Sequence, residues 1–155
     1  MLYEEMLNLA NEHNLVVKEK DLWVHDGLIK DRNIAIRQTI PTNKEKACTL
    51  AEELGHAMTS AGDIMDYNDP NNWKQEVKAR TFGYHLMITP EQLIDAYKHG
   101  CRGKHELAEY LNVTVPYLDE AVERFHGIYG LYQRYGDYVI VFEPCLNIVE
   151  FSQDI

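Results

Sequence analysis

The spacing of apolar residues along the chain predicts helices in its middle and short strands near its ends. Apolar residues three and four positions apart are typical of helices, and short runs rich in β-branched residues are typical of strands. The predicted helices cover residues 2–13, 43–59, 71–87, 90–99, 103–111 and 116–128. The predicted strands are residues 15–18, a hairpin of 27–30 and 33–36, and two strands within 138–151.

The helix predicted over 43–59 has the clearest start and the clearest apolar face. Thr42, followed three residues later by Glu45, makes a capping-box sequence just before the periodic run. The apolar stripe is formed by Ala47, Leu50, Ala51, Leu54 and Met58. Glu52, Glu53 and His56 then lie beside the stripe rather than in its middle. A polar, turn-rich loop over Gly62-Asp63 and residues 66–72 is expected to follow.

The charge of the chain disfavours nucleic acid as its main partner. There are 25 acidic and 15 basic residues, which gives a formal net charge of −10. Such a chain repels a phosphate backbone unless its basic residues gather on one face. One small basic cluster stands out, formed by Lys98, Arg102 and Lys104. We therefore expect no direct binding of nucleic acid.

The cysteines and the apolar runs predict a cytoplasmic protein. The start of the chain lacks the basic and apolar regions of a secretory signal, and no apolar run approaches the roughly 20 residues of a membrane span. Cys48, Cys101 and Cys145 are far apart and form no CxxC pair, so neither a disulfide framework nor a thiolate zinc site is indicated. A reducing compartment and no membrane partner are expected.

The helix over 43–59 carries a spacing that can hold a metal ion. Side chains four residues apart lie on one side of a helix, so Glu52 and His56 can reach the same ion. In the HExxH zinc helix, two ligands four apart hold the metal and the glutamate after the first activates water. The string here is EExxH, with Glu53 as the base. Glu76, on the next helix, is the best candidate for a third ligand.

Each of these residues also has an ordinary explanation. The EExxH string fits an acidic helix surface with one exposed histidine, and Glu76 fits an ion-paired surface position between Lys74 and Lys78. His25, near Trp23 and Asp26, is a further residue that could line a cleft.

The residues around EExxH resemble those of a known family. The segments Leu50-Ala-Glu-Glu-Leu-Gly-His56-Ala57 and Glu76-Val-Lys-Ala79-Arg80 are similar to the ImmA/IrrE metallo-endopeptidases, especially the short members of phages and mobile elements. The likeness extends upstream through Gly27-Leu28-Ile29 and downstream through 105–113. It covers nearly the whole chain.

The resemblance implies an α+β fold and a metallopeptidase. The expected fold is a zincin-like core with a small sheet, a metal-binding helix and a second ligand helix, plus a C-terminal helical segment and terminal strands. Glu52, His56 and Glu76 match metal ligands and Glu53 matches the catalytic glutamate. Glu52 stands where the family usually has histidine, so Mn²⁺ or Fe²⁺ would suit the site as well as Zn²⁺.

The resemblance also implies a protein substrate, a transcriptional repressor of a phage or mobile element, which is cleaved or inactivated. Residues 1–100 would form the metallopeptidase core, and residues 101–155 a helix-turn-helix-like segment with a β tail packed on the core in one compact unit. Two alternatives remain open: a non-catalytic module that antagonises the repressor by binding, and a DNA-binding helix-turn-helix protein.

Overall fold

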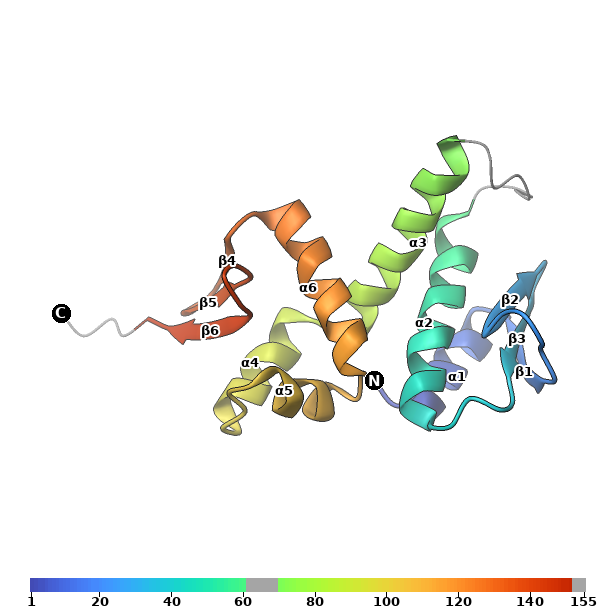
Figure 1. Cartoon of the computed structure of the whole chain (residues 1–155), viewed down its shortest axis with the longest axis horizontal. Coiled ribbons are helices and arrows are strands. Elements are labelled where there is room, and N and C mark those ends of the chain that lie inside the picture. The colour runs from blue at the N-terminus through green and yellow to red at the C-terminus, as the bar shows by residue number, and fades with distance from the viewer. Residues whose placement is uncertain (61–69, 152–155) are drawn as a thin grey trace. The chain divides into compact units, whose positions relative to one another are not determined.

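The structure is a computed structural model that describes residues 1–60 and 70–151 (Figure 1). The chain divides into two compact units, Met1–Met87 and Ile88–Ile155. The division follows the long helix that carries Glu76. The packing of a segment from residue 101 onto a core of residues 1–100 stays a prediction. The polar loop predicted over 62–72 lies for the most part outside the described residues.

The fold is mixed α+β, as the resemblance implied. The first unit contains α1 (Tyr3–Glu12), β1 (Val16–Lys20), β2 (Gly27–Lys30), β3 (Asn33–Arg37), α2 (Asn43–Thr59) and α3 (Pro70–Met87). The second unit contains α4 (Pro90–Lys98), α5 (Lys104–Leu111), α6 (Val115–Tyr129), β4 (Tyr132–Tyr135), β5 (Tyr138–Val141) and β6 (Asn147–Glu150). The predicted helices are confirmed to within two residues at either end.

The sheet of the first unit has the order β1-β3-β2, so β2 is an edge strand. The predicted hairpin is confirmed, because β2 and β3 pair antiparallel, whereas β1 pairs parallel with β3. Asp31 takes the left-handed conformation that the tight turn requires, with φ of 55°. Ile34 and Ile36 are buried on the face of β3 that packs on the helices. This packing brings β2 against α2.

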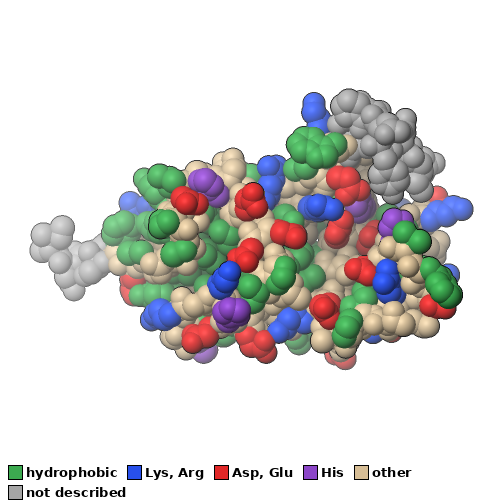
Figure 2. All heavy atoms as spheres, viewed as in Figure 1, with side chains coloured by type: hydrophobic (Ala, Val, Ile, Leu, Met, Phe, Trp, Pro, Cys, Tyr) green, Lys and Arg blue, Asp and Glu red, His purple; other side chains and the backbone are tan. Residues whose placement is uncertain are grey.

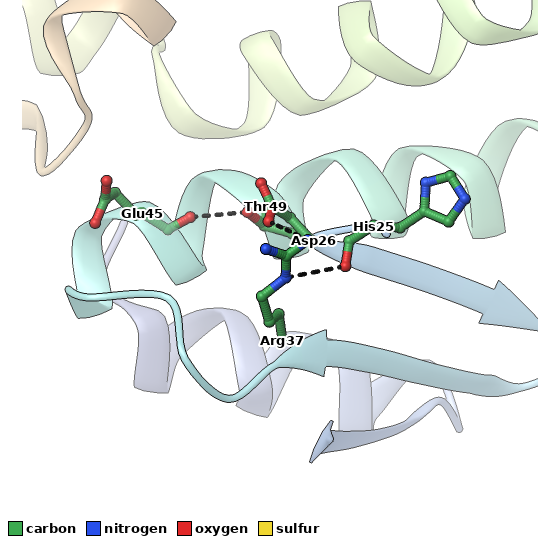
Figure 3. Close-up of polar contacts among 5 residues, drawn as sticks. All are labelled: His25, Asp26, Arg37, Glu45 and Thr49. Atoms are coloured by element: carbon green, nitrogen blue, oxygen red, sulfur yellow. Dashed lines mark hydrogen bonds and ion pairs between the residues drawn. The ribbon is translucent and has the colours of Figure 1, made fainter. Parts of the chain in front are cut away.

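Arg37, at the end of β3, binds the two residues that precede β2 (Figure 3). The Nε of Arg37 donates to the carbonyl of His25 at 3.3 Å, and its Nη2 lies 3.3 Å from Oδ1 of Asp26. The backbone N–H of Arg37 also donates to the carbonyl of Asp26 at 2.8 Å. These contacts fix the residue that follows, Gly27, where β2 meets α2.

Helix α2 begins as its sequence predicts. The hydroxyl of Thr42 accepts from the backbone N–H of Glu45 at 3.2 Å, and the Glu45 carboxylate accepts in turn from the same hydroxyl at 2.9 Å. The predicted stripe is buried at four of its five positions, Ala47, Leu50, Ala51 and Leu54. The prediction for Met58 was wrong, since this residue is 39% exposed, one residue before the helix ends.

The second unit combines three helices with a meander of three antiparallel strands in the order β4-β5-β6. Helices α5 and α6 are joined by a tight turn in which Asn112 is left-handed, with φ of 56°. The hydroxyl of Thr114 caps α6 by accepting from the N–H of Tyr117 at 3.2 Å. Strand β4 was not predicted.

Exposed apolar side chains gather over the strands of the second unit (Figure 2). They belong to Leu131, Tyr132, Tyr135, Val149 and Phe151. A shallow pocket among these strands is lined by Leu131, Tyr132, Arg134, Val139, Val141, Glu143 and Phe151. Within the described residues, no helix has the length and apolar character needed to cross a membrane.

Candidate metal centre

Helices α2 and α3 lie side by side in the first unit and approach each other closely at Gly55 (Figure 1). A Cβ atom added at Gly55 would lie 2.0 Å from the backbone oxygen of Ala79. Only a residue without a side chain allows that backbone contact. The faces of α2 and α3 on either side of this contact are therefore held within reach of each other's side chains.

Three predicted ligands converge across this helix pair. Glu52 and His56 project from α2 and Glu76 from α3, and one ligand atom from each lies within 4.8 Å of the others. Nε2 of His56 is 3.4 Å from Oε1 of Glu76. All three side chains are partly exposed, so an ion and a substrate could reach them. Spacing of four residues along α2 brings Glu52 and His56 to one side, as predicted.

Glu53 lies beside these three residues but is buried, with 8% of its surface exposed. Its carboxylate faces β2, where a Cβ atom at Gly27 would be 2.7 Å from its Oε1. Burial, followed by the charges of Glu52 and Glu76, raises the pKa of Glu53 from 4.5 to about 8. Glu53 is thus the one acidic side chain of the group that is enclosed by the fold and poised to exchange a proton near neutral pH.

Arg80 is a fourth residue beside the three candidate ligands, and it contacts Glu52. It lies one helical turn after Glu76 on α3, and its Nε is 3.5 Å from Oε1 of Glu52 on α2. Burial acts to lower the pKa of Arg80, but the neighbouring charges, with Glu52 the largest, raise it overall. Two contacts therefore run across the helix pair, His56 with Glu76 and Glu52 with Arg80.

The donor set fits a divalent metal ion. Two carboxylates and one imidazole are three protein ligands, the number typical of a catalytic zinc site that keeps a position open. Three carboxylates, at positions 52, 53 and 76, meet in this region with one guanidinium beside them, and like charges at this range repel. A bound dication relieves that repulsion. The hard carboxylate ligands also suit Mn²⁺ and Fe²⁺.

Among the described residues, the one group of three side chains that could hold a metal ion contains neither His25 nor His85. His25 is exposed, and Figure 3 shows its imidazole directed away from Arg37. The Nδ1 of His85 lies 2.9 Å from the carbonyl of Thr81 on its own helix. Nε2 of His56 reaches Glu76 from the facing helix, and the Glu76 side chain is 38% exposed, so Glu76 is a partly exposed residue that faces α2.

Sequence reasoning did not assign a role to three residues of this site, Gly27, Gly55 and Arg80. The two glycines stand where another element comes too close for a side chain, and this follows only from the packing. Arg80 lies four residues after Glu76, a helical spacing that would have placed both on the same face of α3.

The arrangement is that of a metallopeptidase-like protein, with an EExxH helix, a second ligand helix and an edge strand beside the buried glutamate. The sequence model of the peptidase M78 family, described as IrrE N-terminal-like domain, matches residues 10–123. The chain belongs to this family, which confirms the resemblance to ImmA/IrrE proteins. The family indicates a metallopeptidase-type hydrolase that uses a divalent metal. A comparison with curated proteins gave no match.

Proposed function

We propose that this protein is a metal-dependent endopeptidase that cleaves, and so inactivates, a transcriptional repressor of a phage or mobile element. The single observation that carries the catalytic part is the convergence of Glu52, His56 and Glu76 within 4.8 Å, beside a buried glutamate. The repressor as substrate rests on the likeness to the ImmA/IrrE proteins. Zn²⁺ is the proposed ion, and Mn²⁺ or Fe²⁺ would suit the two carboxylate ligands.

Each residue has a defined part in the proposed reaction. Glu52, His56 and Glu76 would hold the ion, which when bound supplies Lewis acidity to the scissile carbonyl and to the attacking water. Glu53 takes the proton from that water as its oxygen bonds to the carbonyl carbon. When the C–N bond breaks, Glu53 returns the proton to the leaving amine. The fold contributes the burial and the neighbours that raise the pKa of Glu53.

The proposal is tested with a transcriptional repressor of a phage or mobile element as the substrate. Purified protein is loaded with Zn²⁺, and repressor fragments are followed by mass spectrometry. Glu53→Gln should abolish cleavage, a loss of at least about 100-fold for a general base, while the protein keeps its metal and its fold. Glu123→Gln, an exposed glutamate on α6, is the matched control and should cleave normally.

Two results would contradict this function. Cleavage by Glu53→Gln at the normal rate would refute the assignment of the base. If instead the wild-type protein and Glu53→Gln both relieve repression without fragments forming, the protein acts as a non-catalytic binding module. A retarded DNA band that weakens steeply with salt would support the second alternative, a DNA-binding protein.

A further inference from the structure

Glu52 is one of the two glutamates among the three candidate ligands. It is an acidic side chain 39% exposed to solvent, in the position where the HExxH pattern has a histidine. A glutamate has one more rotatable bond than a histidine. Holding it still for a metal costs rotamer entropy equivalent to roughly tenfold in affinity. A side chain in this position therefore needs a partner that orients it.

The side chain placed to do so is Arg80. The Nε of Arg80 lies 3.5 Å from Oε1 of Glu52, and the two residues come from facing helices. The contact between Gly55 and Ala79 fixes the distance between these helices. A carboxylate has two oxygens, so one can face a guanidinium while the other coordinates an ion. Such partners of metal ligands fix ligand orientation.

Charge counting leads to the same residue. Glu52, Glu53 and Glu76 together carry three negative charges when all are ionised. A dication and the Arg80 guanidinium together carry three positive charges, so the loaded site is neutral with His56 uncharged. A neutral site is the arrangement that costs least to keep partly buried.

We propose that Arg80 is a positioning residue that orients Glu52 as a metal ligand in this EExxH variant of the site. This inference rests on the proposed metal site but not on the identity of the substrate. An opposite effect must be weighed, because a cation near a metal site also repels the ion. The Arg80 side chain is 56% exposed, and water screens its charge at the ion. Arg80 contacts Glu52 directly, whereas the ion would bind the other carboxylate oxygen, so the positioning effect should dominate.

Metal titration of purified, metal-stripped protein tests the proposal without any substrate. Co²⁺ serves as the probe, since its visible absorption reports both occupancy and ligand geometry, and Zn²⁺ affinity is measured by competition with Co²⁺. Arg80→Ala should weaken Co²⁺ and Zn²⁺ binding by about 10- to 100-fold. Arg80→Lys, which keeps the charge without the planar fork, should fall between Arg80→Ala and the wild type.

Two controls separate positioning from general effects of charge and stability. Lys78→Ala removes an exposed cation two residues away on the same helix and should change affinity by less than about threefold. The melting temperature of the metal-free Arg80→Ala protein should stay close to that of the wild type. In a Glu52→Ala background, Arg80→Ala should have almost no further effect, because the two residues act as one unit.

The outcomes distinguish failure of this inference from failure of the proposed function. Equal or tighter metal binding by Arg80→Ala, in a wild type that binds Co²⁺, overturns the positioning role and leaves the metal site in place. An effect of Arg80→Ala that persists undiminished without Glu52 overturns it as well. A wild type that binds neither Co²⁺ nor Zn²⁺ overturns both proposals.

Discussion

Two pairs of helices in this molecule carry several acidic side chains, yet within the described residues only one of these pairs forms a candidate metal site. On α5 and α6 the acidic groups are exposed and have surface partners, as in the ion pair of Lys104 with Asp119 at 3.3 Å. On α2 and α3 the acidic groups face one another, and one of them, Glu53, is buried. The two pairs carry similar numbers of acidic residues, four on α2 and α3 and five on α5 and α6. The difference is that α2 and α3 approach closely enough to bring their acidic side chains near one another.

The largest effect should come from a substitution that forces α2 and α3 apart. In Gly55→Ala, the new methyl group would overlap the backbone oxygen of Ala79, which cannot move without shifting α3. We expect a loss of about 3 kcal/mol or more in the free energy of unfolding, at the upper end of overpacking costs. Urea denaturation measures this loss, and Co²⁺ titration should show that the metal site is lost with it.

A glycine-to-alanine substitution on α6 is the control. Gly127 lies on α6 with nothing within 4 Å of a Cβ atom, and its backbone is helical. Gly127→Ala should therefore stabilise the protein, by up to about 1 kcal/mol. If Gly55→Ala is tolerated as well as Gly127→Ala, the close approach of α2 and α3 is not what shapes the site.

An intermediate effect concerns pH in the metal-stripped protein. The unfolded chain releases the Glu53 proton near pH 4.5, whereas the folded chain holds it to about 8. Between these values the folded state binds more protons, so stability should decrease as pH rises, by up to about 1.4 kcal/mol per pH unit. Denaturation series at pH 5, 6, 7 and 8 measure the slope.

Glu53→Gln should flatten that slope, because an amide does not titrate. Glu123→Gln, an exposed position on α6, should leave the pH slope of stability unchanged. A wild-type slope equal to that of Glu53→Gln would mean that Glu53 ionises in the folded protein as it does in the unfolded chain.

The smallest effect should come from breaking the ion pair between α5 and α6. Lys104 and Asp119 are each more than half exposed, so water screens their attraction. A double-mutant cycle with Lys104→Ala and Asp119→Ala should give a coupling energy below about 1 kcal/mol, falling further in high salt. A larger coupling energy that does not fall with salt would mean that the exposed acidic residues of α5 and α6 interact as strongly as the clustered ones of α2 and α3.

Much of the fold could be predicted, because its signals are local. The cap at Thr42 and the apolar stripe from Ala47 to Leu54 gave the bounds of α2, and the run around Asp31 gave the hairpin. Strand β4 was missed because its residues, Tyr132–Tyr135, alternate little in polarity. The parallel pairing of β1 with β3 was also missed, since no local pattern encodes a partner that far along the chain.

The candidate site could be predicted only in part. The spacing of Glu52 and His56 gave one face of α2, Glu76 followed as a candidate on the next helix, and the resemblance matched it to a metal ligand. The burial of Glu53 could not be predicted from α2 alone, since it depends on β2 packing across the helix. The position of Met58 failed for a related reason: its place on the apolar stripe did not show that the packing surface ends before it.

The bare backbone at Gly27 links two distant positions in the chain. The carboxylate of Glu53 occupies the volume that any side chain at 27 would fill. The two positions should therefore be inherited together: relatives that keep a glutamate at 53 should keep glycine at 27, and relatives that gain a side chain at 27 should carry a shorter residue at 53. A descendant that has lost catalysis would be free to abandon both, so the pair offers a sequence marker for whether a given lineage still depends on its buried acid.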